Sequence, residues 1–403
     1  MKVNLVNCRV IDCVSDTIIE DAAVIIDGDR IERVVQGSAA DEVGENGGKT
    51  VDLGGSTVLP GLWDVHCHPG GVIPDPTKQR AFETQAERTI RAFNNAASVL
   101  DVGVTSLRVT AEASYIDIAL RDAFEEGTVL GPRLFCCGRA IKATGGHGSY
   151  RGVKEVYQES GWEVDGPHEC RKAAREELKM GADQLKIMIS GGIAGGHESM
   201  DEPQMTLEEM AAVCDVAHKK GTIVSAHSGG PTAIQTAIEA GVDCFEHGYY
   251  LDDKTIEMMA EAGAWYVPTL SVTQNEDYMR RHNWPEHSLQ RALEGAPVHR
   301  EGFRKALEAG IKIASGADLN PIAETALPEI EQLVKCGMSN SEALVAATSN
   351  AAQLCGVEDE LGTVQEGKIA DLIVVDGNPL DDIQDLYNLE LVIKNGDIVV
   401  DKR

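Results

Sequence analysis

Histidine, lysine and aspartate side chains recur at the ends of short apolar runs in this sequence. His66 and His68 close the run LWDVHCH and are two residues apart. In an extended strand this spacing points both imidazoles to the same face. Two polar rings in an apolar interior are costly without partners, and a bound cation would supply one. A pair of surface or hydrogen-bonded histidines is the alternative, because H-x-H alone is a short motif.

Three further residues stand in similar positions. His227 ends TIVSAH, and His247 lies at the end of DCFEH. Imidazole nitrogens suit zinc and similar ions, so these histidines favour a metal site that includes His66 and His68. Asp318 follows KIASGA and could be a helix cap or part of a turn. As a ligand it would supply a carboxylate oxygen, and as a catalytic residue it would take a proton from metal-bound water.

Lys186 lies in the middle of the apolar run QLKIMIS. A desolvated ammonium is costly unless it is neutralised or paired. A carbamate formed with carbon dioxide would turn this amine into an anionic ligand that can bridge two cations. Pairing with Asp183 or Asp318, or snorkelling of the side chain out of the interior, are the alternatives.

Strand and helix patterns alternate along the central part of the chain. Between residues 59 and 356, short apolar strands alternate with amphipathic helices, as in a parallel sheet covered by helices. Helix signals include a capping box at Thr206 and Glu209 and a terminal Gly263. The eight predicted strands are 62–68, 105–110, 133–139, 184–190, 222–227, 243–248, 265–270 and 312–318.

Eight such units predict an α/β fold with a (β/α)8 TIM-type barrel. In that fold the carboxyl ends of the strands form the active-site face, which would bring the residues above together. An open doubly wound sheet is the competitor, and it would need fewer strands.

The two ends of the chain have a different pattern. Residues 2–35 and 363–403 contain short strands, with hairpin signals at Asp27–Gly28 and Asn395–Gly396. Neither segment is long enough for a core of its own. We therefore predict a small β-sandwich domain built from both termini, residues 1–58 plus 357–403, and a barrel domain of residues 59–356.

Composition excludes several classes of function. With 36 basic and 65 acidic residues the net charge is −29, which repels phosphate backbones and anionic lipid and predicts no nucleic-acid or membrane partner. No run of eighteen apolar residues occurs, and the first residues lack the apolar core of a signal peptide, which predicts a cytoplasmic protein. The 10 cysteines form no C-x-x-C pair, which favours reduced, packed thiols.

Over essentially its whole length the sequence resembles the metal-dependent amidohydrolase superfamily. The motifs that carry the resemblance are PGLWDVHCH at 60–68, Lys186, His227, FEHG at 245–248, GAD at 316–318, and GTV with GKIADL between 362 and 372. The resemblance implies a site for two divalent metal ions, usually zinc. One ion would be held by His66, His68 and Asp318 and the other by His227 and His247, with N6-carboxylated Lys186 and a hydroxide bridging them.

Within the superfamily the chain is most similar to the prolidase-like dipeptidases and the imidazolonepropionase-related group. Imidazolonepropionase itself is mononuclear and lacks the lysine, so Lys186 argues against that activity. In the dipeptidases a histidine matching His147, in the loop TGGHG, helps bind the substrate near its scissile carbonyl or carboxylate. A glycine-rich turn with an incidental histidine is the alternative. Ser228, which we expect to bind substrate, begins a Ser-Gly-Gly sequence where several dipeptidases have alanine and tyrosine, which weakens the case for proline specificity.

Other histidines lie in loops and polar segments. His197 belongs to a glycine-rich loop after the fourth predicted strand and is expected to line the substrate pocket, with a lid that makes no direct contact as the alternative. His282, His287 and His299 fall in a polar stretch, and we predict that they are surface residues of a helical excursion.

Together these features predict a metal-dependent amidohydrolase that acts on a small molecule. The leading hypothesis is a dipeptidase (Xaa-Pro or related) or an N-acyl amino acid hydrolase that uses a metal-bridging hydroxide. Hydrolysis of a cyclic amide, a lactone or a toxin-like amide on the same site is the alternative. A non-catalytic assembly protein would be expected to have lost metal ligands, and here all six positions are filled. The resemblance suggests a homo-oligomer, although the residues themselves show no self-complementary patch.

Overall fold

The computed structural model describes residues 2–14, 16–37, 48–71, 83–149, 161–195 and 198–403. The chain packs as two compact units. Unit 1 comprises Met1–Asp64, Ser98–Ser106 and Ala326–Arg403, and unit 2 comprises Val65–Ala97 and Leu107–Thr325. The domain boundaries expected from the sequence stay a prediction.

Unit 1 contains the β-sandwich, in which strands from both ends of the chain pair. Its strand order is β18-β17-β16-β5-β1-β2-β3, with β4 paired to β1. Both predicted hairpins are confirmed, because Gly28 (φ 62°) joins β2 to β3, and Asn395 (φ 49°) with Gly396 (φ 79°) joins β17 to β18. The strands are β1 (Lys2–Ile11), β2 (Ile18–Asp27), β3 (Arg30–Gln36), β4 (Lys49–Asp52), β5 (Thr57–Pro60), β16 (Leu372–Val375), β17 (Leu389–Lys394) and β18 (Asp397–Asp401).

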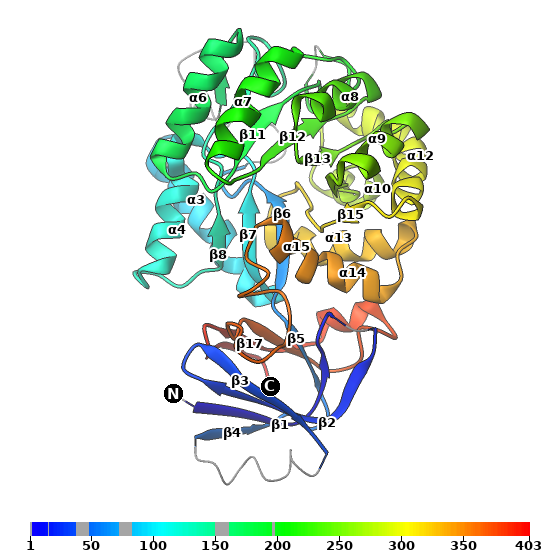
Figure 1. Ribbon diagram of the computed structural model, residues 1–403. Helices are drawn as coiled ribbons and strands as arrows, with labels where there is room; N and C mark the ends of the chain where they lie inside the picture. The colour runs from blue at the N-terminus through cyan, green and yellow to red at the C-terminus, as the bar shows by residue number, and fades with distance from the viewer. Residues whose placement is uncertain (1, 15, 38–47, 72–82, 150–160, 196–197) are drawn as a thin grey trace. The chain divides into compact units, whose positions relative to one another are not determined.

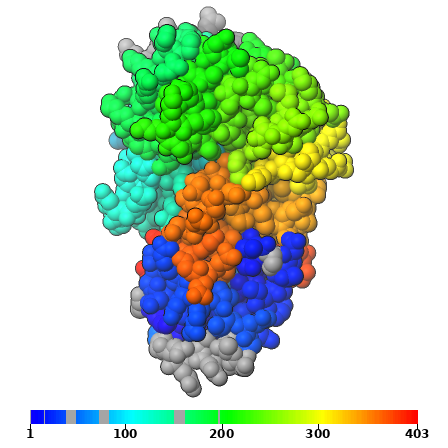
Figure 2. Space-filling model, in the orientation of Figure 1, coloured from blue at the N-terminus to red at the C-terminus, as the bar shows by residue number. Residues whose placement is uncertain are grey.

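The core of the sandwich is aliphatic. It includes Leu5, Val24 and Leu391, each fully buried. Figure 2 shows the segment that follows α15 (orange) packed beside the N-terminal strands (blue). Backbone hydrogen bonds join these distant parts of the chain, among them one of 2.8 Å from Ile31 N to Lys368 O.

The barrel strands confirm the predicted (β/α)8 fold, because all eight predicted runs contain a strand. The hydrogen bond from Val65 N to Ser315 O (2.9 Å) joins the first strand to the segment after the last. At the other junction, Asp183 N donates to Cys136 O (2.8 Å). The eight strands are β6 (Leu62–Cys67), β7 (Val104–Val109), β8 (Arg133–Phe135), β11 (Leu185–Met188), β12 (Val224–Ser228), β13 (Cys244–His247), β14 (Trp265–Val267) and β15 (Lys312–Ile313).

The third barrel strand differs from the prediction. β8 covers only the first part of 133–139, and two short strands that the sequence did not predict, β9 (Ala140–Lys142) and β10 (Gly161–Glu163), extend the sheet beside β11. Gly138 has a φ of 66°, and a Cβ there would overlap the Glu177 carboxylate. The chain therefore turns at this glycine instead of continuing the strand.

Helices α6 to α9 lie outside strands β11 to β13 (Figure 1). The predicted capping box is confirmed, since the Thr206 hydroxyl accepts from Glu209 N (3.3 Å) and the Glu209 carboxylate accepts from Thr206 N (2.8 Å). The helices are α3 (Gln85–Ala97), α4 (Ile116–Glu125), α6 (Pro167–Met180), α7 (Leu207–Lys219), α8 (Pro231–Ala240), α9 (Asp253–Ala262), α10 (Ser271–Gln274), α11 (Glu276–Arg281), α12 (Glu286–Glu308), α13 (Ile322–Cys336), α14 (Asn340–Ala346) and α15 (Ser349–Leu354). Three 3-10 helices are η2 (Ser98–Val102), η3 (Ala113–Tyr115) and η5 (Ile383–Tyr387).

Two observations bear on the expected environment of the protein. Within the described ranges, no helix is both long and apolar enough to cross a membrane. All ten cysteines lie in the described part of the chain, none of them forms a disulfide there, and Cys355 alone among them is not fully buried.

Candidate metal centre and active site

Four imidazoles converge at the carboxyl ends of the barrel strands, as the sequence predicts for this fold. The ring centroid of His66, in β6, lies 5.4 Å from that of His68 and 5.0 Å from that of His247, the last residue of β13. The ring of His227, in β12, lies 4.5 Å from that of His247. Strands distant in the sequence therefore place their histidines in mutual contact.

Asp318 joins this cluster from the segment after β15. Its Oδ1 lies 3.1 Å from His68 Nε2 and 3.5 Å from His66 Nε2, and its Oδ2 lies 3.9 Å from His247 Nε2. His66, His247 and Asp318 each offer a ligand atom, and these atoms all lie within 4.8 Å of one another. This donor set of two imidazoles and a carboxylate fits a divalent metal ion.

Two of the imidazoles are oriented by hydrogen bonds at Nδ1. His66 Nδ1 contacts Glu246 Oε2 at 2.7 Å, and His68 Nδ1 contacts the carbonyl oxygen of Ala111 at 2.9 Å. In both rings Nε2 is the nitrogen left to face Asp318. Metal-binding histidines are typically held in this way, with the second nitrogen bonded to a carboxylate or carbonyl group.

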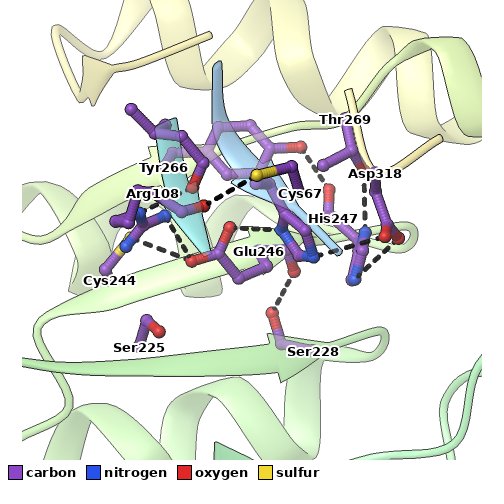
Figure 3. Close-up of polar contacts among 12 residues, drawn as sticks. Cys67, Arg108, Ser225, Ser228, Cys244, Glu246, His247, Tyr266, Thr269 and Asp318 are labelled. Carbon is purple, nitrogen blue, oxygen red and sulfur yellow. Dashed lines mark hydrogen bonds and ion pairs between the residues drawn. The ribbon is translucent and has the colours of Figure 1, made fainter. Parts of the chain in front are cut away.

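The other two imidazoles are held in a similar manner. His247 Nδ1 lies 2.7 Å from the hydroxyl of Thr269 (Figure 3), which again leaves Nε2 available. His227 Nε2 lies 3.1 Å from the carbonyl oxygen of Gly191, so that Nδ1 is its available nitrogen. In each of the four rings, one nitrogen is held by a hydrogen bond and the other is available to a metal ion.

A buried ion pair lies beneath the cluster. Glu246 Oε1 accepts from Arg108 Nη2 at 2.7 Å (Figure 3). Oε2 of the same carboxylate contacts His66. Arg108 also donates to the carbonyl oxygen of Val65 (2.6 Å) and to the side chain of Gln184 (3.2 Å). The Arg108 and Glu246 side chains are 1 % and 0 % exposed. Because a buried charge must be paired, this arrangement stabilises the carboxylate that orients His66.

The protonation states suit metal ligation. Burial lowers the pKa of His66, His227 and His247, which favours the neutral imidazole that a metal requires. Burial acts in the same direction on His68, but its hydrogen bond to Asp318 and the carboxylate charge raise its pKa instead. Burial alone would raise the pKa of Asp318, yet the surrounding imidazoles and Lys186 hold this pKa well below its usual range, so the group is a carboxylate.

Lys186 lies in β11 and is 1 % exposed. Burial lowers the pKa of its ammonium despite the opposing charge of Glu246, which favours the neutral amine. Its Nζ has no hydrogen-bond partner among the residues that the structure describes. An unpartnered polar atom at this depth is costly, which is what a site for an additional group would show. Pairing with Asp183 is not observed, since that carboxylate binds Arg121 (3.0 Å).

Three residues at the strand ends have a left-handed backbone conformation, which residues other than glycine rarely adopt. They are His247 (φ 66°), Thr269 (φ 49°) and Asp318 (φ 54°). Such conformations cost about 1–3 kcal/mol each and concentrate at functional sites. Here they turn two candidate ligands, and the hydroxyl that orients one of them, toward the cluster.

Comparison with known proteins agrees with this geometry. The model of the amidohydrolase family matches residues 57–399. The chain belongs to the amidohydrolase family.

Three relatives show how far the similarity extends. Ochratoxinase of Aspergillus niger is 33% identical over 352 residues, which are 81% of this chain and 72% of that protein. The crystal structure of a Xaa-Pro dipeptidase with bound methionine in the active site has a TM-score of 0.89 and 33% identity and covers 99% of both chains. A prolidase complexed with N-methylphosphonate-L-proline has a TM-score of 0.89 and 32% identity and covers 100% of both chains. The family and its relatives confirm that this amidohydrolase is an enzyme.

Of the three expected substrate-binding residues, the structure describes His147 and Ser228. In this amidohydrolase the ring of His147 stacks on that of His227, with centroids 3.9 Å apart and an interplanar angle of 11°. Ser228 is fully buried, and its hydroxyl donates to the carbonyl oxygen of Glu246 at 2.7 Å (Figure 3). His197 lies outside the described residues. The substrate-binding role of all three stays a prediction.

One expectation about the helical excursion was wrong. His299, predicted at the surface, is fully buried on α12, where Nε2 donates to the carbonyl oxygen of His247 (2.9 Å) and Nδ1 lies 2.8 Å from Thr273 Oγ1. Burial lowers the pKa of His299 to about 4, so the ring is neutral. The surrounding polar sequence hid this residue, because one face of a long helix can be buried while its other faces are charged.

Sequence reasoning also missed the residues that orient the site of this amidohydrolase. Glu246 was part of a recognised motif but was given no role, and Arg108 was not singled out at all. A signal was present, because each is a charged residue inside an apolar strand, as Lys186 is. Such residues need partners, and Arg108 and Glu246 are each other's partner.

Proposed function

We propose that this amidohydrolase is a metal-dependent hydrolase of small amides, acting on dipeptides or N-acyl amino acids. The observation that carries the proposal is the amine of Lys186, which has no hydrogen-bond partner among the described residues and is buried in the same barrel as the four imidazoles and the Asp318 carboxylate. A single metal site would not need this lysine. A site for two cations would use it as a bridging anion.

The proposed ligands are those that the family resemblance implies. His66, His68 and Asp318 would hold one divalent ion, His227 and His247 would hold the other, and carboxylated Lys186 would serve both. Zinc is the proposed metal, since imidazole-rich sites suit it. When bound, such ions lower the pKa of water to supply a nucleophile and polarise the carbonyl oxygen of the substrate. The cytoplasmic location and the homo-oligomeric state likewise stay predictions.

Carboxylation of Lys186 requires the neutral amine, which burial favours because it lowers the pKa of the ammonium. The nitrogen lone pair attacks the carbon of carbon dioxide, a nitrogen–carbon bond forms, one carbon–oxygen π bond becomes an oxygen lone pair, and the amine proton passes to water. The product is an anionic carbamate with two oxygen donors. Its charge would be balanced by the cations, which removes the cost of an unpartnered polar atom in the interior.

Two residues would then act on the substrate. Asp318 is a carboxylate, so its oxygen can accept a proton from the attacking water and deliver it to the leaving amide nitrogen. His147, stacked on His227, would orient the substrate or share the negative charge that develops on the carbonyl oxygen.

Similarity to the Xaa-Pro dipeptidase and the prolidase supports a dipeptide substrate. A second candidate is a toxin-like amide, and the 33% identity to ochratoxinase favours it. The sequence Ser228-Gly229-Gly230 stands where several dipeptidases have alanine and tyrosine. This difference favours a substrate other than an Xaa-Pro dipeptide.

The test combines metal analysis with a substrate panel. Purified protein is expected to retain about two divalent ions per chain and to hydrolyse dipeptides or N-acyl amino acids faster than lactams and lactones. Protein supplied with ¹³C-bicarbonate should show a carbamate carbon signal that Lys186→Ala abolishes and that the exposed-lysine control Lys219→Ala retains. Metal-free protein that hydrolyses amides at the same rate would refute the proposal.

A further inference from the structure

We propose that Glu198 is a positioning residue that fixes the ring of His147 for contact with the substrate. Neither residue is among the metal ligands expected here. The inference rests on the proposed amide hydrolysis, but the hydrogen bond on which it depends can be tested without turnover.

Glu198 and His147 belong to a closed set of hydrogen bonds. Glu198 Oε1 lies 2.6 Å from His147 Nδ1, and Glu198 Oε2 accepts from Gln204 Nε2 at 3.1 Å. The oxygen of the same Gln204 side chain accepts from the backbone N–H of His147 at 2.7 Å. Both the ring and the main chain of His147 are therefore held by the segment that carries Glu198.

The contact differs from an ordinary surface ion pair. The side chains of His147 and Glu198 are 17 % and 11 % exposed, and one carboxylate is shared between an imidazole and an amide. Exposed pairs contribute little because long side chains must be ordered in water. Here the hydrogen bonds with Gln204 already order the carboxylate, so it can determine the orientation of the ring.

The nitrogen that remains is the one that matters for the substrate. With Nδ1 directed at Glu198, Nε2 is the nitrogen of His147 that a substrate can reach. The ring is parallel to that of His227, which is an expected metal ligand. A rotation of the His147 ring about the Cβ–Cγ bond would break the contact between Nδ1 and Glu198 and would also move Nε2. The Glu198 carboxylate therefore fixes the positions of both ring nitrogens.

Two glycines allow this close approach. A Cβ at Gly192 would overlap the ring of His147 and would lie 2.9 Å from His227 Cε1. A Cβ at Gly195 would overlap the carboxylate of Glu198. Both positions therefore require glycine, because the side chains of His147 and Glu198 occupy the space that a Cβ would need.

Gly192 and Gly195 also have a contact with a helix. Arg291, on α12, donates to the carbonyl oxygens of Gly192 (3.3 Å) and Gly195. A loop with several glycines would otherwise sample many conformations. This contact from a helix holds the two glycines whose missing side chains leave room for His147 and Glu198.

Steady-state kinetics provide the first test. Glu198→Ala is expected to lower kcat/KM about 10- to 100-fold, with metal content and Tm unchanged, because the ring of His147 loses its orientation. Glu198→Gln keeps an acceptor oxygen for Nδ1–H and should fall between the wild type and Glu198→Ala. The matched control is Glu202→Gln, an exposed carboxylate on the same loop, which should retain wild-type kinetics.

A double-mutant cycle separates positioning from an independent effect. In a His147→Ala background, Glu198→Ala should cost little further activity, since its target is already absent. An equal loss in both backgrounds would overturn the proposal. Loss of metal from Glu198→Ala would also overturn it, because the effect would then pass through the metal site instead of through His147.

A spectroscopic measurement completes the test without any substrate. In protein with ¹⁵N-labelled histidine rings, the Nδ1 proton of His147 should give a downfield signal that Glu198→Ala removes and Glu202→Gln retains. If this signal is present but no amide is hydrolysed, the proposed function fails while the contact stands. If the signal is absent from the wild type, the positioning role fails whatever the activity.

Discussion

The sandwich core and the barrel interior are both buried, but they are built from opposite kinds of residue. The sandwich packs aliphatic side chains such as Leu5, Val24 and Leu391. The barrel interior near the imidazole cluster holds Arg108, Glu246 and Lys186 at nearly complete burial. The first arrangement gains free energy directly from removing apolar surface from water. The second must pair or neutralise every charge that it buries.

This contrast separates residues that serve stability from residues that serve the reaction. Removal of a sandwich side chain should affect folding and leave the chemistry of folded molecules intact. Removal of a barrel charge should affect the site, and sometimes the fold as well. Four predictions test this division.

The largest effect is expected at Asp318. Asp318→Asn removes the carboxylate that would transfer the proton, so kcat should fall by about 10²- to 10⁴-fold. Turnover and metal content are to be measured on the same samples. Near-normal turnover at full metal occupancy would remove Asp318 from proton transfer.

Arg108 and Leu391 provide a matched pair of substitutions. Arg108→Met should lower the free energy of unfolding by about 3–5 kcal/mol, because it leaves the Glu246 carboxylate buried and unpaired. Leu391→Ala should lower it by about 2–5 kcal/mol through a cavity in the sandwich. Urea unfolding measures both. Only Arg108→Met should also reduce the specific activity of the folded fraction. A similar reduction for Leu391→Ala would contradict the distinction between sandwich residues that serve stability and barrel residues that serve the reaction.

Glu246 should affect metal binding as well as folding, because its substitution also leaves the Arg108 guanidinium buried without its carboxylate partner. Glu246→Gln keeps a side chain of the same shape but removes the charge that orients His66, so metal affinity should decrease about 10- to 100-fold. Competition with a chelator gives the affinity. An unchanged affinity would show that the hydrogen bond, and not the charge, orients this ligand.

The smallest effect concerns pH and His299. Its folded-state pKa is lowered to about 4 by burial, while the unfolded chain takes up the proton near the usual 6.5. Between these values the unfolded state binds more protons, so stability falls as the pH falls. The contribution between pH 7 and pH 5 is up to about 2 kcal/mol. His299→Gln should flatten this part of the pH profile of urea unfolding, and an identical slope would contradict the assignment.

Much of the fold could be predicted from the sequence because its signals are local. The alternation of strands and helices, the capping box at Thr206 and the hairpin at Asn395–Gly396 each depend on neighbouring residues. The turn at Gly138 was missed, since it arises from contact with Glu177, which comes from a distant helix. A single sequence does not show such a contact.

The site was predictable for a similar reason, and only in part. The carboxyl ends of the strands form one face of a TIM-type barrel, so histidines at these ends are expected to lie near one another. The partners that orient these histidines did not, because Glu246, Thr269 and Glu198 reach them from other strands and loops. Their positions depend on side-chain packing, which the pattern of apolar residues does not encode.

The guanidinium of Arg108 joins several strands of the barrel at one point. It bonds the main chain of β6 at Val65, the side chain of Gln184 just before β11, and Glu246 in β13. The guanidinium that connects these strands therefore also holds Glu246, the carboxylate that contacts His66. A substitution at Arg108 should therefore disturb the connection between these strands and the orientation of His66 together.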